Sequence, residues 1–106
     1  FGQFGHFYKF AKERIPYPTE RYTNEARRLL GVLEKRLEGR DYLIDDEYTI
    51  ADICTFPWVG CLDWGYGARE YLKLDADFPH VVAWYTRCTQ KPASVRGAKV
   101  CAFSDD

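Results

Sequence analysis

Arg21, Glu25 and Arg28 are residues whose type and spacing could bind an anionic ligand. They are four and three positions apart, so on a helix they would lie on one face. The guanidinium group of an arginine is a planar fork that can bind a carboxylate through two hydrogen bonds. The same spacing also produces ion pairs along a solvated helix face. From these residues alone the solvated face is the favoured interpretation, and ligand binding by Arg21 is the alternative.

The aromatic residues near the start of the chain could form a wall of an apolar pocket. Four of them stand at close to helical intervals: Phe4, Phe7, Tyr8 and Phe10. Side chains at these positions cannot all point the same way. We predict that Phe4 and Tyr8, which are four positions apart, line a pocket. The alternatives are packing against neighbouring helices and a contact between two copies of the chain.

The cysteines and histidines show no pattern typical of a metal site or a catalytic site. The chain contains Cys54, Cys61, Cys88 and Cys101, with no C-x-x-C motif, and His6 and His80 lie far from them. We therefore predict no metal site. Cys54 and Cys61 lie in an apolar stretch, where burial makes a thiol unreactive. Histidine is a common general base, but no nucleophile stands beside His6.

Thr49 and Asp52 mark the beginning of a helix. The Thr49 side chain can accept a hydrogen bond from the first turn, and the Asp52 carboxylate can reach back to the Thr49 backbone, which together form a capping box. The ten residues from Ile53 to Leu62 are apolar on nearly every side. Such a helix is typical of the middle of a core. We assign Thr49 and Asp52 a structural role as caps.

Helical periodicity predominates along the rest of the chain. Apolar residues recur at intervals of three and four from Tyr22 to Leu37, which predicts a long helix over about residues 18–38 that Gly39 ends. Asp77 is predicted to cap a later helix. Shorter helices are predicted over about residues 1–14, 68–72 and 93–100. The sequence thus predicts an all-α bundle of about five or six helices with short connections.

The composition excludes several classes of protein. A formal net charge of −1 favours neither nucleic acid nor an anionic membrane as a partner. The longest apolar run is too short to span a bilayer. Free cysteines in a core suit a reducing compartment, which favours the cytoplasm. The chain has 106 residues and contains 0 Met, and we expect it to be a piece of a longer protein.

Several short motifs, in this order, resemble the C-terminal helical domain of glutathione transferases. They are Tyr48-Thr49-Ile50-Ala51-Asp52, Pro57-Trp58, Phe78-Pro79-His80-Val81 with Trp84, and Lys91-Pro92-Ala93. The resemblance covers nearly the whole chain. Gly5-His6-Phe7-Tyr8, Ile15-Pro16-Tyr17 and Glu20-Arg21-Tyr22 are similar to the nu-class branch, which includes glutathione-dependent disulfide-bond reductases.

The resemblance implies that residues 1–106 are one helical domain of a two-domain protein. The partner would be an N-terminal thioredoxin-fold domain that carries most of the glutathione site. The residue that matches the glutathione-contacting arginine of nu-class relatives is Arg21. The reacting thiols would belong to glutathione, with a disulfide or small electrophile as second substrate, and the protein would be a homodimer. By itself the chain is expected to be inactive, with no catalytic residue of its own.

Two other interpretations are open. Helical domains of this type are also attached to translation factors and aminoacyl-tRNA synthetases, where they dock partner proteins without catalysis. The chain could also be a folded piece with an exposed apolar face, which would promote self-association.

Overall fold

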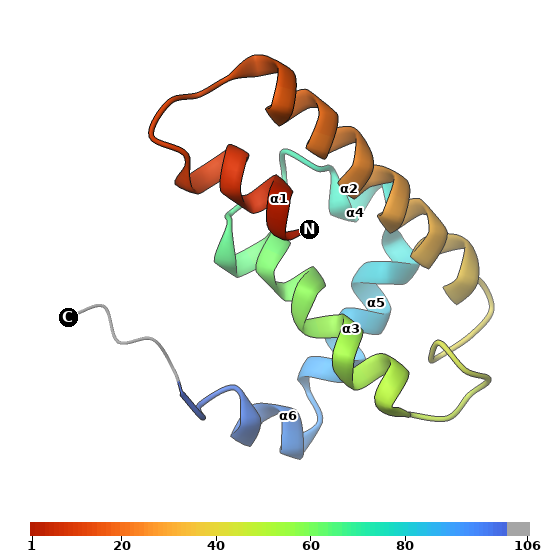
Figure 1. Cartoon of the computed structure of the whole chain (residues 1–106). Helices are drawn as coiled ribbons and strands as arrows, with labels where there is room; N and C mark the ends of the chain where they lie inside the picture. The colour runs from red at the N-terminus through yellow and green to blue at the C-terminus, as the bar shows by residue number, and fades with distance from the viewer. Residues whose placement is uncertain (102–106) are drawn as a thin grey trace.

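The computed structural model describes residues 1–101, and these form six α-helices and two π-helical segments (Figure 1). In chain order they are α1 (Gly2–Gly5), η1 (His6–Phe10), α2 (Pro16–Leu37), α3 (Ile50–Gly60), η2 (Cys61–Gly65), α4 (Leu74–Asp77), α5 (Pro79–Thr89) and α6 (Pro92–Gly97). Over the described range no β-strand forms, and an isolated bridge joins Ile44 and Glu47. The predicted all-α bundle is confirmed.

Helix α2 is the longest element, and it follows the predicted apolar pattern closely. Pro16 occupies its first position, where the fixed φ of proline suits a helix and no backbone hydrogen bond is lost. The stripe places Ala26, Leu30 and Leu37 in the core. Gly39 has φ +69°, a left-handed conformation that glycine adopts without strain, and the helix ends just before it.

Helix α5 lies at the centre of the bundle. It contacts α2, α3, α4 and α6, and it buries Val81, Trp84 and Cys88 completely. The other buried apolar residues come from most of the remaining elements: Phe4, Ala26, Leu30, Leu37, Val59, Leu62, Ala68, Leu72, Leu74 and Phe78. The core is therefore built around α5.

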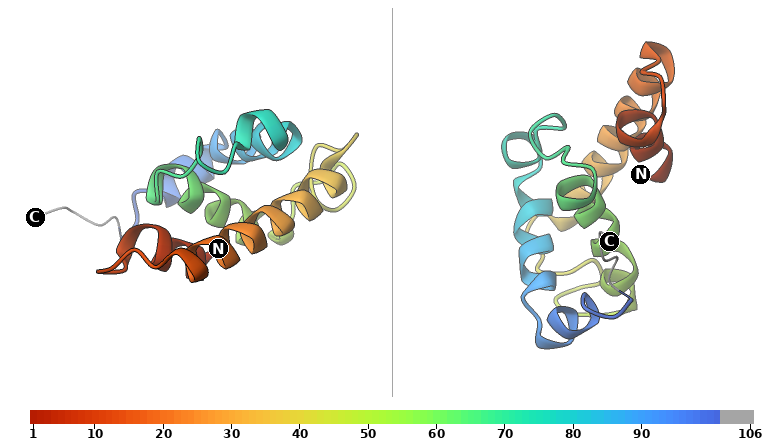
Figure 2. Two further views of the ribbon diagram at one scale, coloured as in Figure 1. Left: turned by 90° about the horizontal axis from the view of Figure 1, so that it is seen from above. Right: turned by 90° about the vertical axis from the view of Figure 1, so that its left-hand side faces the viewer.

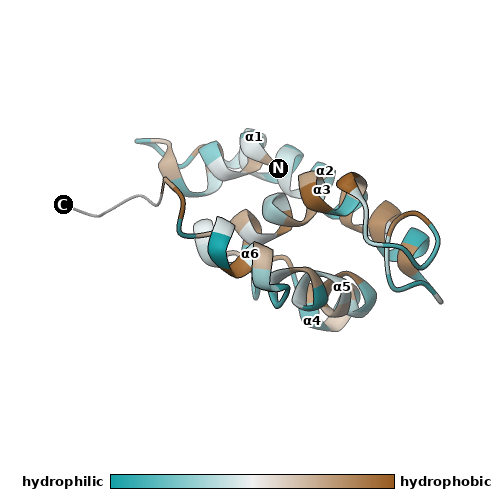
Figure 3. Ribbon diagram, turned by 90° about the horizontal axis from the view of Figure 1, so that it is seen from below, coloured by the Kyte–Doolittle hydropathy of each residue, from teal (hydrophilic) through white to brown (hydrophobic). Residues whose placement is uncertain are grey.

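The prediction that α3 is buried on all sides is wrong for this chain. Val59 is buried, but Ile50 is 81% exposed and Trp58 is 51% exposed. The molecule is flat, measuring 42 × 36 × 20 Å, so part of the surface of α3 stays in contact with solvent (Figure 2). Figure 3 shows the hydrophobic residues that α3 carries. Helix α3 begins where predicted, but several of its apolar side chains remain about half exposed or more within residues 1–101.

The predicted cap of α5 is also corrected. The first helical residue is Pro79, and no side-chain cap comes from the residue before it. Instead the carboxylate of Glu34 on α2 accepts hydrogen bonds from the backbone N–H groups of His80 at 3.0 Å and Val81 at 2.9 Å. Asp77 pairs with Arg27 at 2.6 Å. A side chain 46 residues away in sequence thus caps this helix.

Two short elements differ from their predicted form. Residues 68–72 form turns instead of a helix, and the short helix follows at α4. The first helix ends at Phe10, and much of it is π-helical. None of the helices described is long and apolar enough to cross a lipid bilayer.

Candidate functional site

The first half of α2 presents a row of polar side chains to solvent. Tyr17, Arg21, Glu25 and Arg28 follow at intervals of four, four and three positions and are all exposed. Tyr22, the residue after Arg21, anchors this part of the helix, because its ring stacks on Phe7 of η1 at 5.6 Å between centroids. The helix therefore holds these side chains on a fixed backbone.

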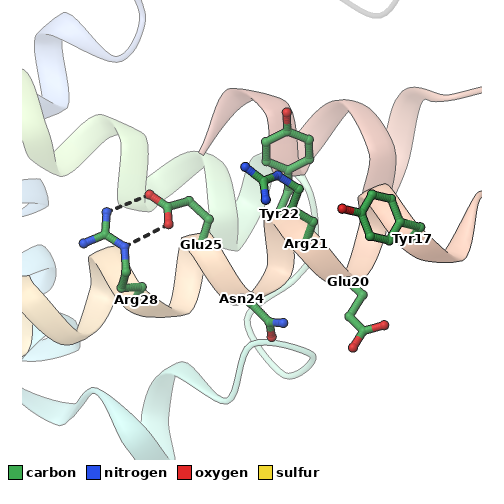
Figure 4. A pocket seen from close by; sticks show the side chains of 7 residues that line it. All are labelled: Tyr17, Glu20, Arg21, Tyr22, Asn24, Glu25 and Arg28. Atoms are coloured by element: carbon green, nitrogen blue, oxygen red, sulfur yellow. Dashed lines mark hydrogen bonds and ion pairs between the residues drawn. The ribbon is translucent and has the colours of Figure 1, made fainter.

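A shallow hollow of about 470 Å³ lies along this row (Figure 4). Its lining residues all belong to α2: Tyr17, Glu20, Arg21, Tyr22, Asn24, Glu25 and Arg28. A hollow on a single helix has one wall and is open to solvent. Such a surface can contribute part of a binding site, and another surface has to complete it.

Of the two arginines in this hollow, Arg28 is paired with a carboxylate and Arg21 is not. Arg28 donates two hydrogen bonds to Glu25, from Nε at 2.8 Å and from a terminal nitrogen at 2.7 Å (Figure 4). These bonds lower the pKa of Glu25, and the positive charge of Arg21 adds a smaller effect in the same direction. Arg21 itself forms no hydrogen bond or ion pair with any residue between 1 and 101. The predicted solvated ladder is thus half present, and the guanidinium group of Arg21 is unpaired among the described residues.

A third arginine of α2, Arg27, is used for packing. Arg27 points away from the hollow and donates to the carbonyl of Leu72 and to Asp77. Its guanidinium group also lies over the ring of Phe78, 5.1 Å from the centroid. Arg27 therefore joins α2 to the region around α4, and Arg21 differs from it in having no such partner.

Phe4 and Tyr8 are stacked on each other, with their centroids 5.0 Å apart. Phe4 is only 2% exposed, so its ring has almost no surface left for a ligand, and the structure gives its predicted pocket role no support. Tyr8 is half-buried between the rings of Phe4 and Tyr71, and the guanidinium group of Arg14 lies 5.5 Å from its centroid. Neither ring lines the hollow at Arg21. The role of Tyr8 stays a prediction.

The capping box at Thr49 and Asp52 is present. The Thr49 hydroxyl accepts from the Ala51 N–H at 3.2 Å, and Asp52 accepts from the Thr49 N–H at 3.0 Å. Asp52 is fully buried and also accepts from Trp84 Nε1 at 2.8 Å and from the Leu43 N–H at 3.0 Å. With three donors satisfying it, this carboxylate has a structural role.

The cysteines differ in exposure. Cys54 is exposed, so the prediction of a buried thiol is wrong there, because it lies on the open face of α3. Cys88 is buried, and burial raises its pKa to about 12, with a further contribution from the nearby Asp52 charge. Over residues 1–101, no cluster of three or more His, Cys, Asp or Glu side chains could hold a metal ion.

A second, more apolar groove of about 700 Å³ lies between α3, α5 and α6. Its lining includes Ile53, Phe56, Trp64 and Tyr85, together with residues of α6. The sequence did not predict this groove, because it depends on how α6 is placed against the other two helices.

Comparison with known proteins identifies the family of this fold. Residues 5–92 match the family model "Glutathione S-transferase, C-terminal domain". The chain is 43% identical over 98 residues to the disulfide-bond oxidoreductase YghU of Escherichia coli, a match that covers 91% of this chain and 34% of that protein.

Two solved structures have a closely similar fold. A glutathione transferase from Burkholderia graminis with two glutathione molecules bound per subunit has a TM-score of 0.90 and 45% identity, covering 97% of this chain and 43% of that one. A glutathione transferase from Pseudomonas putida with one glutathione disulfide bound per subunit has a TM-score of 0.88 and 40% identity, covering 95% and 44%. The chain spans less than half the length of each of these relatives.

Proposed function

The chain belongs to the glutathione S-transferase C-terminal domain family, and from this we propose that it is the helical half of a nu-like glutathione transferase. The enzyme would use the thiolate of glutathione against disulfides or small electrophiles. The observation that carries the proposal is the unpaired guanidinium group of Arg21 in the hollow on α2. Relatives solved with glutathione or its disulfide support the choice of ligand.

Arg21 would bind one of the two carboxylates of glutathione. Its planar fork can donate two parallel hydrogen bonds, and these bonds are stronger when both partners are charged. Because Arg21 is not committed to Glu25 or Glu20, binding a ligand does not require breaking an existing ion pair. The Tyr17 hydroxyl and the Asn24 amide lie in the same hollow and could satisfy further polar groups of the tripeptide.

The proposed reaction is a thiol–disulfide exchange. The thiolate of one glutathione attacks a sulfur of the substrate disulfide, a mixed disulfide forms, and the other half leaves as a thiolate. A second glutathione thiolate then attacks the glutathione sulfur of the mixed disulfide, which releases the second substrate thiolate and glutathione disulfide. Both electrons come from the two glutathione molecules. The chain positions these molecules and contributes no reacting group.

An upstream thioredoxin-fold domain would supply the rest of the glutathione site. It would also cover the open apolar face of α3, including Trp58. The Trp58 ring lies beside the first residues of the chain, 3.9 Å from the position of a Cβ added to Gly2.

We further propose a homodimer in a reducing cytoplasm, which fits four cysteines without a disulfide. Tyr8 is the proposed contact for the second substrate.

The test is the glutathione affinity of the complete protein with Arg21→Ala. We expect binding to weaken by about 1.5–3 kcal/mol, roughly ten- to 150-fold in the dissociation constant, because a charge-assisted contact is lost. Arg21→Lys should recover part of the affinity, since an ammonium group restores the charge without the bidentate geometry. Isothermal titration calorimetry measures both.

Arg40→Ala is the matched control, because Arg40 is also exposed but lies in the loop after α2, outside the hollow. This variant should bind glutathione like the unmodified protein. An Arg21→Ala protein with unchanged affinity would exclude Arg21 from the site.

A further inference from the structure

We propose that Arg28 is a positioning residue for glutathione binding: by holding the carboxylate of Glu25, it keeps the guanidinium group of Arg21 open for a ligand carboxylate. The inference rests on the proposed function, because it assigns to Arg28 a role in the same site. Arg28 itself is not proposed to touch the ligand.

The geometry shows which way Glu25 turns. Its two carboxylate oxygens accept from Arg28 at 2.8 and 2.7 Å, in a bidentate arrangement that uses both oxygens (Figure 4). In the same view the hydrogen bonds drawn to Glu25 come from Arg28, and none is drawn from Arg21. Both Glu25 oxygens are therefore bound by Arg28 and neither is bound by Arg21, although Glu25 and Arg21 are only one helical turn apart.

Without Arg28, Glu25 would have a second partner within reach. Residues four positions apart are neighbours on a helix surface, so Glu25 could swing back to Arg21. The pair with Arg28 is favoured in the intact protein, because an acidic residue on the N-terminal side of a basic one is the better orientation on a helix. Arg28 therefore determines whether the Glu25 carboxylate pairs with Arg28 or with Arg21.

This competition affects ligand binding directly. A ligand carboxylate at Arg21 would have to displace Glu25 if the two were paired, and it would also meet an uncompensated negative charge. With Arg28 in place, the ligand meets a free guanidinium group and a neutralised Glu25. The neighbouring Arg27 cannot take over this role, since it is bound to Asp77 and the Leu72 carbonyl.

A double-mutant cycle on the complete protein tests the inference. Glutathione dissociation constants are measured by calorimetry at low ionic strength, where exposed charges are least screened. Arg28→Gln should raise the dissociation constant about two-fold, as expected when a helix-surface ion pair competes with the ligand. Glu25→Gln alone should change it by less than about 1.5-fold, because Glu25 is already held.

The informative variant is the double replacement of Glu25 and Arg28 by Gln. Removing the competing carboxylate should bring the dissociation constant back to within about 1.5-fold of the unmodified protein. Equal effects of Glu25→Gln in both backgrounds would mean that Arg28 acts only through its own charge, and an unchanged affinity in Arg28→Gln would also overturn the inference. If Arg21→Ala weakens binding but the cycle is additive, only this inference fails. If Arg21→Ala has no effect, the proposed function fails with it.

Discussion

Asp52 is the residue on which most of the local structure around α3 depends. Its carboxylate is fully buried and accepts hydrogen bonds from the loop before α3, from the first residue of the capping box and from the indole of Trp84. A buried carboxylate is tolerated when donors satisfy it. Removing it would leave those donors without a partner inside the core.

We expect Asp52→Ala to lower the free energy of unfolding by about 3 kcal/mol or more, because a helix cap is lost and buried donors are left unsatisfied. Urea unfolding followed by circular dichroism measures the change. Asp46→Ala is the control, since Asp46 is exposed and accepts only one long hydrogen bond of 3.4 Å. That variant should stay within about 0.5 kcal/mol of the unmodified chain.

The buried thiol of Cys88 predicts how the stability of the fold depends on pH. Its thiol is buried near Asp52, and burial raises its pKa from 9.0 to about 12. Between these two values the unfolded chain loses the proton and the folded chain keeps it. Stability should therefore fall as the pH rises above 9, by up to about 1.4 kcal/mol per pH unit from this group. Chemical unfolding at several pH values, compared with Cys88→Ala, isolates the contribution.

The reactivity of the thiols provides the independent check on Cys88. At pH 8 a thiol reagent should modify the exposed Cys54 and leave Cys88 unmodified until the chain is unfolded. Rapid modification of Cys88 in the folded chain, or a pH dependence identical in Cys88→Ala, would contradict the burial on which the prediction depends.

At the scale of elements, the capping of α5 by Glu34 gives a direct test of the packing of two helices. We expect Glu34→Ala to destabilise the fold by about 1–2 kcal/mol, because the two backbone N–H groups at the start of α5 lose their acceptor. Asp77→Ala should cost at most about 1 kcal/mol, since its pair with Arg27 is partly exposed. Thermal or urea unfolding ranks the two variants.

The opposite ranking would show that the residue next to α5 in sequence is its cap, as the sequence alone suggests. Glu34→Gln refines the comparison, because an amide keeps one oxygen acceptor and should recover part of the stability.

Local signals made most of the elements predictable. Thr49 and Asp52 are three positions apart and cap the helix that follows them, and Gly39 adopts the left-handed φ that ends α2. The partner of α5 was not predictable in this way, because Glu34 and His80 are brought together only by the packing of α2 against α5. Local motifs carry their own geometry, whereas contacts across the fold depend on all the elements at once.

The candidate site was predictable to a similar extent. The resemblance pointed to Arg21, and helical spacing placed Glu25 and Arg28 on the same face. The spacing could not show which of the two arginines would bind Glu25, because both are within reach. The prediction for Phe4 was limited in a similar way. Its position on a helix was clear from the sequence, but the neighbours that bury it come from elsewhere in the chain, among them Tyr66 and Tyr71.

At the scale of the whole molecule, the open face of α3 is the feature that the chain does not satisfy by itself. Ile50, Trp58 and Trp64 are each at least half exposed, and the adjacent groove is lined mainly by apolar groups. Exposed apolar surface of this kind is typical of a surface that another protein surface covers. The chain also spans less than half of the relatives that it matches.

We expect the isolated chain to self-associate through this face, because apolar area that water contacts is removed when two copies meet. Sedimentation velocity at increasing concentration should show a rising average mass. Replacing Ile50 and Trp58 by Ser should shift the association to higher concentration, while Val32→Ser should not, although Val32 is 57% exposed on α2. An isolated chain that stays monomeric, or an equal effect of Val32→Ser, would mean that the α3 face is not an interface. If the proposed thioredoxin-fold domain covers this face, adding such a domain as a separate polypeptide should suppress the self-association, because both partners would compete for the same surface.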